Sequence, residues 1–158
     1  MNEKRSQGGE TTDRIERQIV LHATQSKVWR ALTDAEEFGA WFGMRLEGPF
    51  AAGALVRGRI TIPGYDHVTL EMSVEKIVPE RFFSYRWHPY AVDPAVDYSK
   101  EPTTLVEFRL EKIPEGTRLT VVESGFDRIP AHRRDEAFRM NSAGWNGQLE
   151  NIRRHVSP

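Results

Sequence analysis

The sequence contains no cysteine and no long hydrophobic run. The first absence excludes disulfide bridges, thiol nucleophiles and cysteine-ligated metal sites, and it is compatible with a reducing compartment. The apolar stretches fall well short of the roughly 18 residues that a membrane-spanning helix needs, and residues 1–13 lack the apolar core of a signal peptide. We therefore expect a cytoplasmic protein without a membrane span.

An excess of charge of one sign is also lacking, since 22 lysines and arginines stand against 23 aspartates and glutamates. Nucleic acid and anionic membranes are therefore not expected as partners. No serine lies in a Gly-x-Ser-x-Gly context, no glycine-rich phosphate loop is present, and no histidine pair has the spacing of a zinc site. We accordingly name no catalytic residue and expect neither a metal nor a cofactor.

The residues that are present predict one folded domain preceded by a tail. A chain of 158 residues is long enough for a single domain with a substantial core. Residues 1–13 are polar and lack the apolar surface that would offset the entropy of ordering them. We predict a disordered tail over residues 1–13 and a single domain over residues 14–156.

Local patterns predict a strand and two short helices at the start of this domain. Residues 14–21 place apolar side chains at alternate positions, which indicates a strand. Thr24 has the character of an N-cap and predicts a helix after it. Thr33 and Glu36 have capping-box spacing, which predicts a second helix that carries three rings inward, those of Phe38, Trp41 and Phe42.

Glycine and proline then separate five segments with apolar side chains at alternate positions. These segments cover residues 54–62, 67–77, 81–88, 103–112 and 117–124. Their other positions are mostly polar, as expected for an antiparallel sheet with one face in water. The pattern predicts six strands in all, and residues 45–50 could supply a seventh.

A long C-terminal helix is predicted over residues 131–156, where large side chains recur at a spacing of three or four. The stripe consists of Phe138, Asn141, Trp145, Leu149, Ile152 and Val156. Gly144 and Gly147 each cost up to about 1 kcal/mol in a helix interior relative to alanine. We attribute them to a close approach between the helix backbone and a packed neighbour.

Several motifs, in this order, resemble the family of homologues of the activator of the heat-shock protein 90 ATPase. They are VWRALTD at residues 28–34, WFG at 41–43, GTRLT at 116–120, SGF at 124–126 and GWNGQL at 144–149. The family belongs to the START-like superfamily, also called SRPBCC, which includes lipid-transfer domains, polyketide cyclases and the birch pollen allergen. The resemblance covers residues 14–156 and implies an α+β helix-grip fold. In that fold a curved antiparallel sheet of six or seven strands surrounds a long C-terminal helix, with two short helices after the first strand and a mostly apolar cavity.

The inward registers and the helix stripe together predict a ligand-binding site between the sheet and the last helix. The predicted ligand-binding residues are Trp41, Phe42, Met72, Phe83, Tyr85, Trp87, His88, Phe108, Val121, Glu123, Asn141, Trp145 and Leu149. Most rings of this size belong to protein cores. Two alternatives therefore stay open, a filled core and a cavity that holds a small apolar ligand.

Glu123 is the ionisable residue of most interest, because it continues the inward register of its strand. A carboxylate in an apolar pocket would have a raised pKa and could anchor a ligand. The alternative is that the strand ends there, which leaves Glu123 at a wet rim or paired with Arg118 or Arg139. The loop at residues 90–102, beside His88, is long enough to form a lid at the cavity mouth.

Three functions are compatible with these features. The first is binding of a small hydrophobic or aromatic molecule, as a carrier or a sensor. The second is a co-chaperone-like interaction module with a role in the stress response, in which the outer face of the sheet would contact a chaperone. The third, a cyclase or hydrolase of the superfamily's kind, rests only on Glu123 and a histidine. The expected assembly is a monomer or a homodimer.

Overall fold

The computed structural model describes residues 13–158. Seven antiparallel strands form one sheet in the order β1-β7-β6-β5-β4-β3-β2. The strands are β1 (Arg14–Leu21), β2 (Met44–Leu46), β3 (Leu55–Ile60), β4 (Thr69–Val78), β5 (Phe82–Trp87), β6 (Thr104–Ile113) and β7 (Gly116–Ser124). The helices are α1 (Gln25–Thr33), α2 (Ala35–Phe42) and α3 (Ala131–Val156), with a short turn η2 (Phe126–Arg128) before α3. The predicted fold class is confirmed, and the seventh strand is β2, which is shorter than the predicted range.

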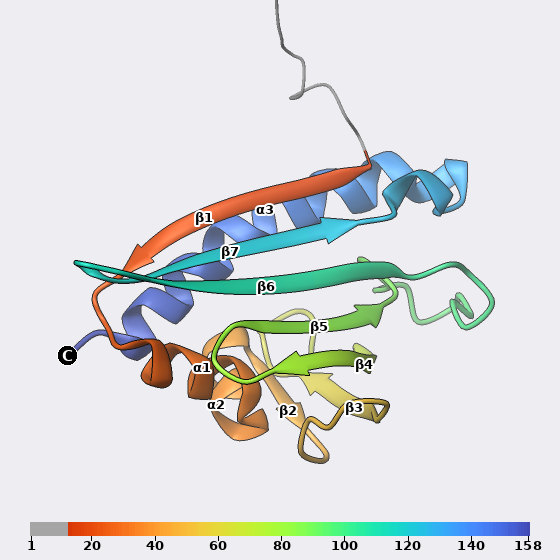
Figure 1. Cartoon of the computed structure of the whole chain (residues 1–158). Coiled ribbons are helices and arrows are strands. Elements are labelled where there is room, and N and C mark those ends of the chain that lie inside the picture. Colours follow the sequence, from red (N-terminus) through yellow and green to blue (C-terminus); the bar gives the residue numbers. More distant parts are fainter. Residues whose placement is uncertain (1–12) are drawn as a thin grey trace, which may run out of the picture.

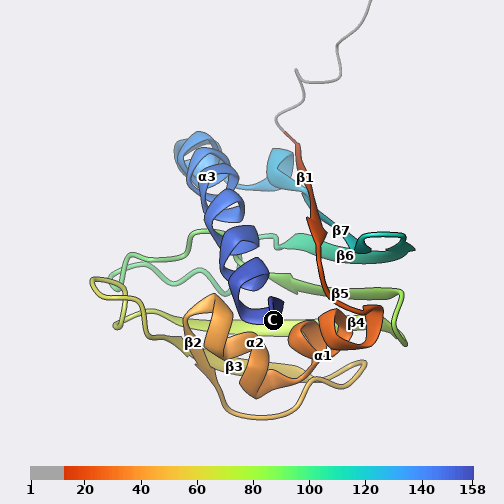
Figure 2. The ribbon, with the colours of Figure 1, turned by 90° about the vertical axis from the view of Figure 1, so that its left-hand side faces the viewer.

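The sheet curls around α3. Figure 1 shows the strands as one twisted layer with α3 behind β1 and β7, and Figure 2 shows the sheet curving around this helix. The two short helices α1 and α2 connect β1 to β2 and contact α3. In Figure 2 they lie beside its C-terminal end. The helix-grip arrangement implied by the resemblance is therefore observed.

The tail predicted for residues 1–13 lies outside the described residues except for Asp13. The backbone oxygen of Asp13 accepts hydrogen bonds from the amides of Gly125, at 3.0 Å, and Phe126, at 3.2 Å. These bonds tie the start of β1 to the turn that follows β7.

The two short helices begin at polar caps. The side chain of Thr24 caps α1, as predicted. The predicted cap of α2 is wrong by one residue, because the carboxylate of Asp34 accepts from the amide of Glu37 at 3.0 Å. Thr33 is the last residue of α1, and its hydroxyl donates to the carbonyl of Trp29 at 2.7 Å. Asp34 caps because its backbone is extended, as an N-cap requires. No helix formed by residues 13–158 has the length and apolar character of a membrane span.

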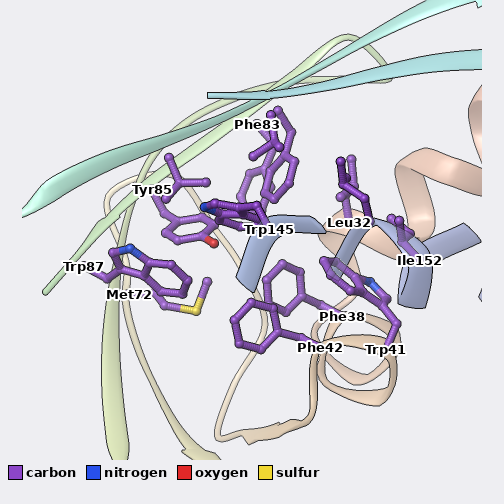
Figure 3. Packing of buried hydrophobic residues seen from close by; sticks show 14 of the residues in the cluster. Leu32, Phe38, Trp41, Phe42, Met72, Phe83, Tyr85, Trp87, Trp145 and Ile152 are labelled. Atoms are coloured by element: carbon purple, nitrogen blue, oxygen red, sulfur yellow. The ribbon is translucent and has the colours of Figure 1, made fainter. Parts of the chain in front are cut away.

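An aromatic core fills much of the space between the sheet and the helices. The inward side chains of β5, β6 and β7 are buried, as predicted. Trp145 of α3 lies between rings of the sheet and rings of α2 (Figure 3). Its ring centroid is 5.8 Å from that of Phe108, 6.1 Å from Trp87 and 6.5 Å from Phe42. Such pairs each add about 0.5–1.5 kcal/mol to the stabilisation from burial alone.

The two glycines of α3 approach no neighbour. Gly144 and Gly147 are exposed, and a Cβ atom added to either would meet nothing within 4 Å. The predicted close approach of the α3 backbone at these positions is therefore wrong. The tightly packed helical glycine is Gly39 of α2, where an added Cβ would lie 2.2 Å from the carbonyl oxygen of Met44.

Candidate functional site

Glu123 lies on the inner face of β7, between β1 and β6. In the sheet register it faces Ile15 on one side and Val106 on the other. It follows Thr117, Leu119 and Val121 in the inward alternation and is fully buried, with an exposed fraction of 0%. The alternative that placed Glu123 at a wet rim is wrong, since α3 covers this part of the sheet.

Four neutral side chains donate hydrogen bonds to the Glu123 carboxylate. The indole Nε1 of Trp145 donates to Oε1 at 2.8 Å, and the indole Nε1 of Trp87 donates to Oε2 at 2.8 Å. The Thr104 hydroxyl donates to Oε2 at 2.5 Å, and the amide Nδ2 of Asn141 lies 3.0 Å from Oε1 and 3.2 Å from Oε2. The donors come from β5, β6 and α3. Glu123 thus ties three elements together beneath the helix.

The electrostatics of this cluster are set by burial. Burial raises the pKa of Glu123 above its ordinary value, and the hydrogen bonds from Thr104 and the other donors act in the opposite direction. The hydroxyl of the neighbouring Tyr85 is buried and has no hydrogen-bond partner among residues 13–158. Burial, and then the charge of Glu123, raise the pKa of Tyr85 well above its ordinary value. This phenol therefore stays protonated.

Two adjoining hollows open beside this cluster, between α3, α2 and the sheet. The larger hollow has a volume of about 230 Å³ and the smaller hollow one of about 90 Å³. Both are lined by Phe42, Trp87, Asn141, Gly144 and Gln148. Trp145 completes the smaller hollow, and the larger one adds Ile60, Ile62, Tyr65, Val68, Leu70, His88, Tyr90, Ala91, Val92 and Met140.

One face of α3 forms a wall common to the hollows. Gly144 and Trp145 follow Asn141 by three and four residues, and Gln148 follows it by seven, so a helix places all four on the same side. The side-chain Nε2 of Gln148 donates to the carbonyl of Phe42 at 2.9 Å, which ties α3 to the end of α2. Gly144 has no side chain, so the wall is recessed there.

The loop between β5 and β6 forms another wall and is held against α3 by Arg133. The Arg133 guanidinium donates from Nε to Glu101 at 2.8 Å and from Nη1 to the carbonyl of Pro89 at 2.8 Å. It also lies 4.7 Å from the ring centroid of Tyr98. Arg133 and Arg134 precede Asp135 and Glu136 in the sequence, and such mixed charges are typical of a solvated helix face. The side chain of Arg133 is instead largely buried, so this interpretation is wrong for Arg133.

The structure separates the predicted ligand-binding residues into those that line the hollows, Glu123 behind them, and those in the core. Five of them line the hollows, namely Phe42, Trp87, His88, Asn141 and Trp145. Glu123 lies behind this lining and accepts hydrogen bonds from three of its residues, Trp87, Asn141 and Trp145. The others pack within the core and line neither hollow: Trp41, Met72, Phe83, Tyr85, Phe108, Val121 and Leu149.

Some contributors to the site have no recognisable signal in the sequence. Thr104 is an ordinary strand residue until the fold brings it to Glu123. Tyr65 and Met140 are single residues in a loop and a helix. Gln148 lies inside the GWNGQL motif, which is the one signal that could have identified it. Each of these residues becomes part of the site only through tertiary contacts.

The lining of the two hollows is mostly apolar. Among residues 13–158, no lysine, arginine, aspartate or glutamate lines the hollows, and both oxygens of Glu123 are already occupied by donors. Within residues 13–158, no three histidine, aspartate or glutamate side chains are grouped so that they could hold a metal ion. The lining offers apolar surface with a few polar groups, which is the usual composition of a small-molecule site.

Comparison with models of known protein families gives a match over most of this chain. A sequence model described as Activator of Hsp90 ATPase homolog 1-like protein matches residues 22–157. No curated protein matches the chain.

Several solved structures share the fold at low sequence identity. Protein MLL2253 from Mesorhizobium loti is 23% identical, with a TM-score of 0.71 over 90% of this chain and 96% of that chain. Protein CV1439 from Chromobacterium violaceum is 20% identical, with a TM-score of 0.71 over 94% and 99% of the two chains. The Aha1 dimer from Colwellia psychrerythraea is 16% identical, with a TM-score of 0.67 over 90% and 95%.

Proposed function

This chain belongs to the family of Activator of Hsp90 ATPase homolog 1-like proteins, and from that premise we propose that it binds a small, mostly apolar molecule in the two hollows beside α3. The family and the fold suit a helix-grip ligand-binding module. The observation that carries the proposal is the pair of hollows at the junction of α3, α2 and the sheet.

The size and lining of the hollows support a ligand of one or two rings. Their volumes of about 230 and 90 Å³ lie below the roughly 300–1,000 Å³ of sites for drug-sized ligands. Phe42 and Trp87 offer ring faces, while His88 and Asn141 offer polar groups for orientation. A carrier or a sensor of a small aromatic compound fits this lining best.

Gly144 provides the sharpest test of the site. Gly144→Leu places a side chain at the recessed point of the wall and should abolish binding of phenethyl alcohol and propylbenzene. The same change should stabilise α3, since replacing a helical glycine contributes up to about 1 kcal/mol. Binding is measured by NMR from the indole N–H signals of Trp87 and Trp145 during titration, with that of Trp29 as an internal reference.

The matched control is Gly147→Leu, one turn along the same helix. Gly147 is exposed and has open space around it, but it lines neither hollow. This variant should gain similar helix stability and keep its affinity for the probes. Equal binding by both variants would contradict the proposed site. Trp145→Ala is less informative, because removing a buried tryptophan costs about 3–5 kcal/mol and also leaves Glu123 without a donor.

A second candidate function, a co-chaperone-like interaction module, is supported by the family's description. The outer face of the sheet carries a groove of about 690 Å³, where Lys76 and Arg109 flank the ring of Phe82. The outward residues Arg57 and Glu71 form an ion pair of 2.8 Å on the same sheet. Co-purification with the host's heat-shock protein 90, and a change in its ATPase rate, test this function. Absence of association at micromolar concentration would count against it.

A further inference from the structure

Glu123 is a fully buried carboxyl group that no cation among residues 13–158 balances. Among residues 13–158, no arginine, lysine or histidine forms an ion pair with it, and all four of its partners are neutral. Indole and primary amide N–H groups can only donate, so three of the four partners require an acceptor. Thr104 and Asn141 carry the oxygens that could accept a hydrogen bond from a protonated carboxyl group, and Asn141 presents Nδ2 instead. The hydrogen-bond pattern therefore favours the ionised form and acts against burial, which raises the pKa of Glu123.

The two indoles that donate to Glu123 also line the smaller hollow. Trp87 and Trp145 are stacked, with an interplanar angle of 26° and centroids 6.1 Å apart, and Phe42 meets both edge-on. Aromatic faces attract cations, and tryptophan does so most strongly. A carboxylate that accepts from the indole N–H increases the electron density of the ring and so strengthens this attraction.

Asn141 adds a hydrogen-bond acceptor to the same hollow. Its Nδ2 donates to both carboxylate oxygens of Glu123, so the opposite amide atom, Oδ1, is turned away from the carboxylate. The opposite atom, Oδ1, receives no hydrogen bond from residues 13–158 and is not buried. The wall thus presents a carbonyl oxygen, with a negative charge behind it.

Within the part of the chain that the structure describes, no positive charge in the lining opposes this arrangement. No lysine or arginine of that part lines either hollow, and its one lining histidine, His88, lies in the larger hollow with its Nε2 3.1 Å from the carbonyl of Glu101. The smaller hollow, of about 90 Å³, therefore combines aromatic faces and a free acceptor. The unbalanced carboxylate of Glu123 lies behind this lining, bonded to Trp87, Asn141 and Trp145.

We propose that the smaller hollow is a subsite for a protonated amine, so that the ligand is an apolar or aromatic molecule with an alkylammonium end. This inference rests on the proposed function and specifies its ligand class. The apolar body occupies the larger hollow, and the ammonium group donates to Asn141 Oδ1 and lies against Trp87 and Trp145. An anionic ligand of the same shape is repelled by Glu123.

Four probes of nearly equal shape test the proposal on the unaltered protein. They are phenethylamine, phenethyl alcohol, propylbenzene and phenylacetate, titrated at neutral pH, where an alkylamine is protonated and a carboxylate is ionised. Phenethylamine should bind roughly tenfold more tightly than phenethyl alcohol, as expected for a cation on partly desolvated aromatic faces. Phenylacetate should bind most weakly.

Glu123→Gln removes the charge with little change of shape and should erase the preference for the amine over the alcohol. The control is Glu115→Gln, which removes the same charge from an exposed turn and should keep that preference. If Glu123→Gln does not fold, the four probes on the unaltered protein still decide. Amine binding no tighter than alcohol binding, or phenylacetate binding equal to either, overturns this inference and leaves the proposed function intact. Binding of none of the four probes overturns the proposed function itself.

Discussion

The carboxylate of Glu123 orients three side chains that line the hollows. Both indoles point their N–H groups at it, and the amide of Asn141 is fixed by the same contact. Carboxylates are almost never fully buried without a charged partner, so this placement is costly for the fold. Hydrogen bonds to both oxygens offset part of this cost, and they also fix the geometry of the lining.

The raised pKa of Glu123 gives the protein a specific pH dependence. The unfolded chain releases the proton near the ordinary glutamate value of 4.5, whereas the folded chain retains it to a higher pH, chiefly because of burial. Between the two pKa values the unfolded state binds fewer protons than the folded state. The contribution of Glu123 to stability is therefore full below the unfolded pKa and is lost as pH rises through the folded pKa.

We therefore expect the free energy of unfolding, taken as wild type minus Glu123→Gln, to decrease as pH rises from about 4 to about 8. Urea unfolding of both proteins across this range measures the difference, and groups that titrate alike in both proteins cancel. A difference that stays constant with pH would show that Glu123 has the same pKa in the folded and unfolded chains.

At the scale of elements, the caps of the short helices fix where the chain turns. Asp34 ends α1 and begins α2, and its carboxylate satisfies an amide that the helix itself cannot. This junction sets the direction of α2, which carries Phe42 to the hollows.

Asp34→Ala should lower the free energy of unfolding by about 1 kcal/mol, the usual value for loss of an N-cap. Thr33→Val removes the hydroxyl of the adjacent residue and keeps the shape of its side chain. This change should lower the free energy of unfolding less, because the Thr33 hydroxyl donates to the Trp29 carbonyl, which already accepts a hydrogen bond within α1. Thermal unfolding of the two variants compares them directly, and a larger loss for Thr33→Val would restore Thr33 as the cap.

Arg133 holds the loop of residues 88–103 against α3, and this loop supplies Tyr90 and Val92 to the larger hollow. Arg133→Met should release it, since hydrogen bonds to charged groups contribute about 1.5–3 kcal/mol. The expected result is faster amide hydrogen exchange over residues 89–102, by roughly tenfold to a hundredfold. Arg134→Met is the control, because Arg134 bonds to the carbonyl of Ile129 and not to the loop. Equal exchange in both variants would contradict the role of Arg133.

At the scale of the whole molecule, the hollows lie where three parts of the fold meet. α3, α2 and the strands β3 to β5 each contribute lining residues. A ligand there contacts all three, so its binding should stabilise the complete fold rather than one segment.

A bound ligand at a hundred times its dissociation constant stabilises a protein by about 2.7 kcal/mol. For a protein of this size, each kcal/mol raises the melting temperature by about 2–4 °C. Phenethylamine at that excess should therefore raise it by roughly 5–10 °C. Differential scanning calorimetry measures the shift, and Gly144→Leu should show none.

Much of the fold could be predicted from the sequence, because periodicity is a local property. The predicted range 131–156 of the last helix coincides with α3, Ala131–Val156. The alternation in β7 correctly turned Glu123 inward. The cap was misplaced because Thr33 and Asp34 both have a suitable oxygen, and only the backbone conformation distinguishes them.

The site could be predicted only in part, because its contacts join distant residues. The donors to Glu123 lie between 18 and 36 positions away along the chain, so no local pattern contains them. The sequence likewise could not separate Trp87, which lines a hollow, from Phe83, which fills the core of the same strand face.

The sequence by itself determined the elements and which of their faces are apolar, since hydrogen bonding within helices and alternation along strands depend on near neighbours. Only the tertiary structure decided where the rings fill space and where they leave it open. That outcome depends on how side chains from α2, α3 and the sheet fit against one another, and the fit is a property of the packed molecule.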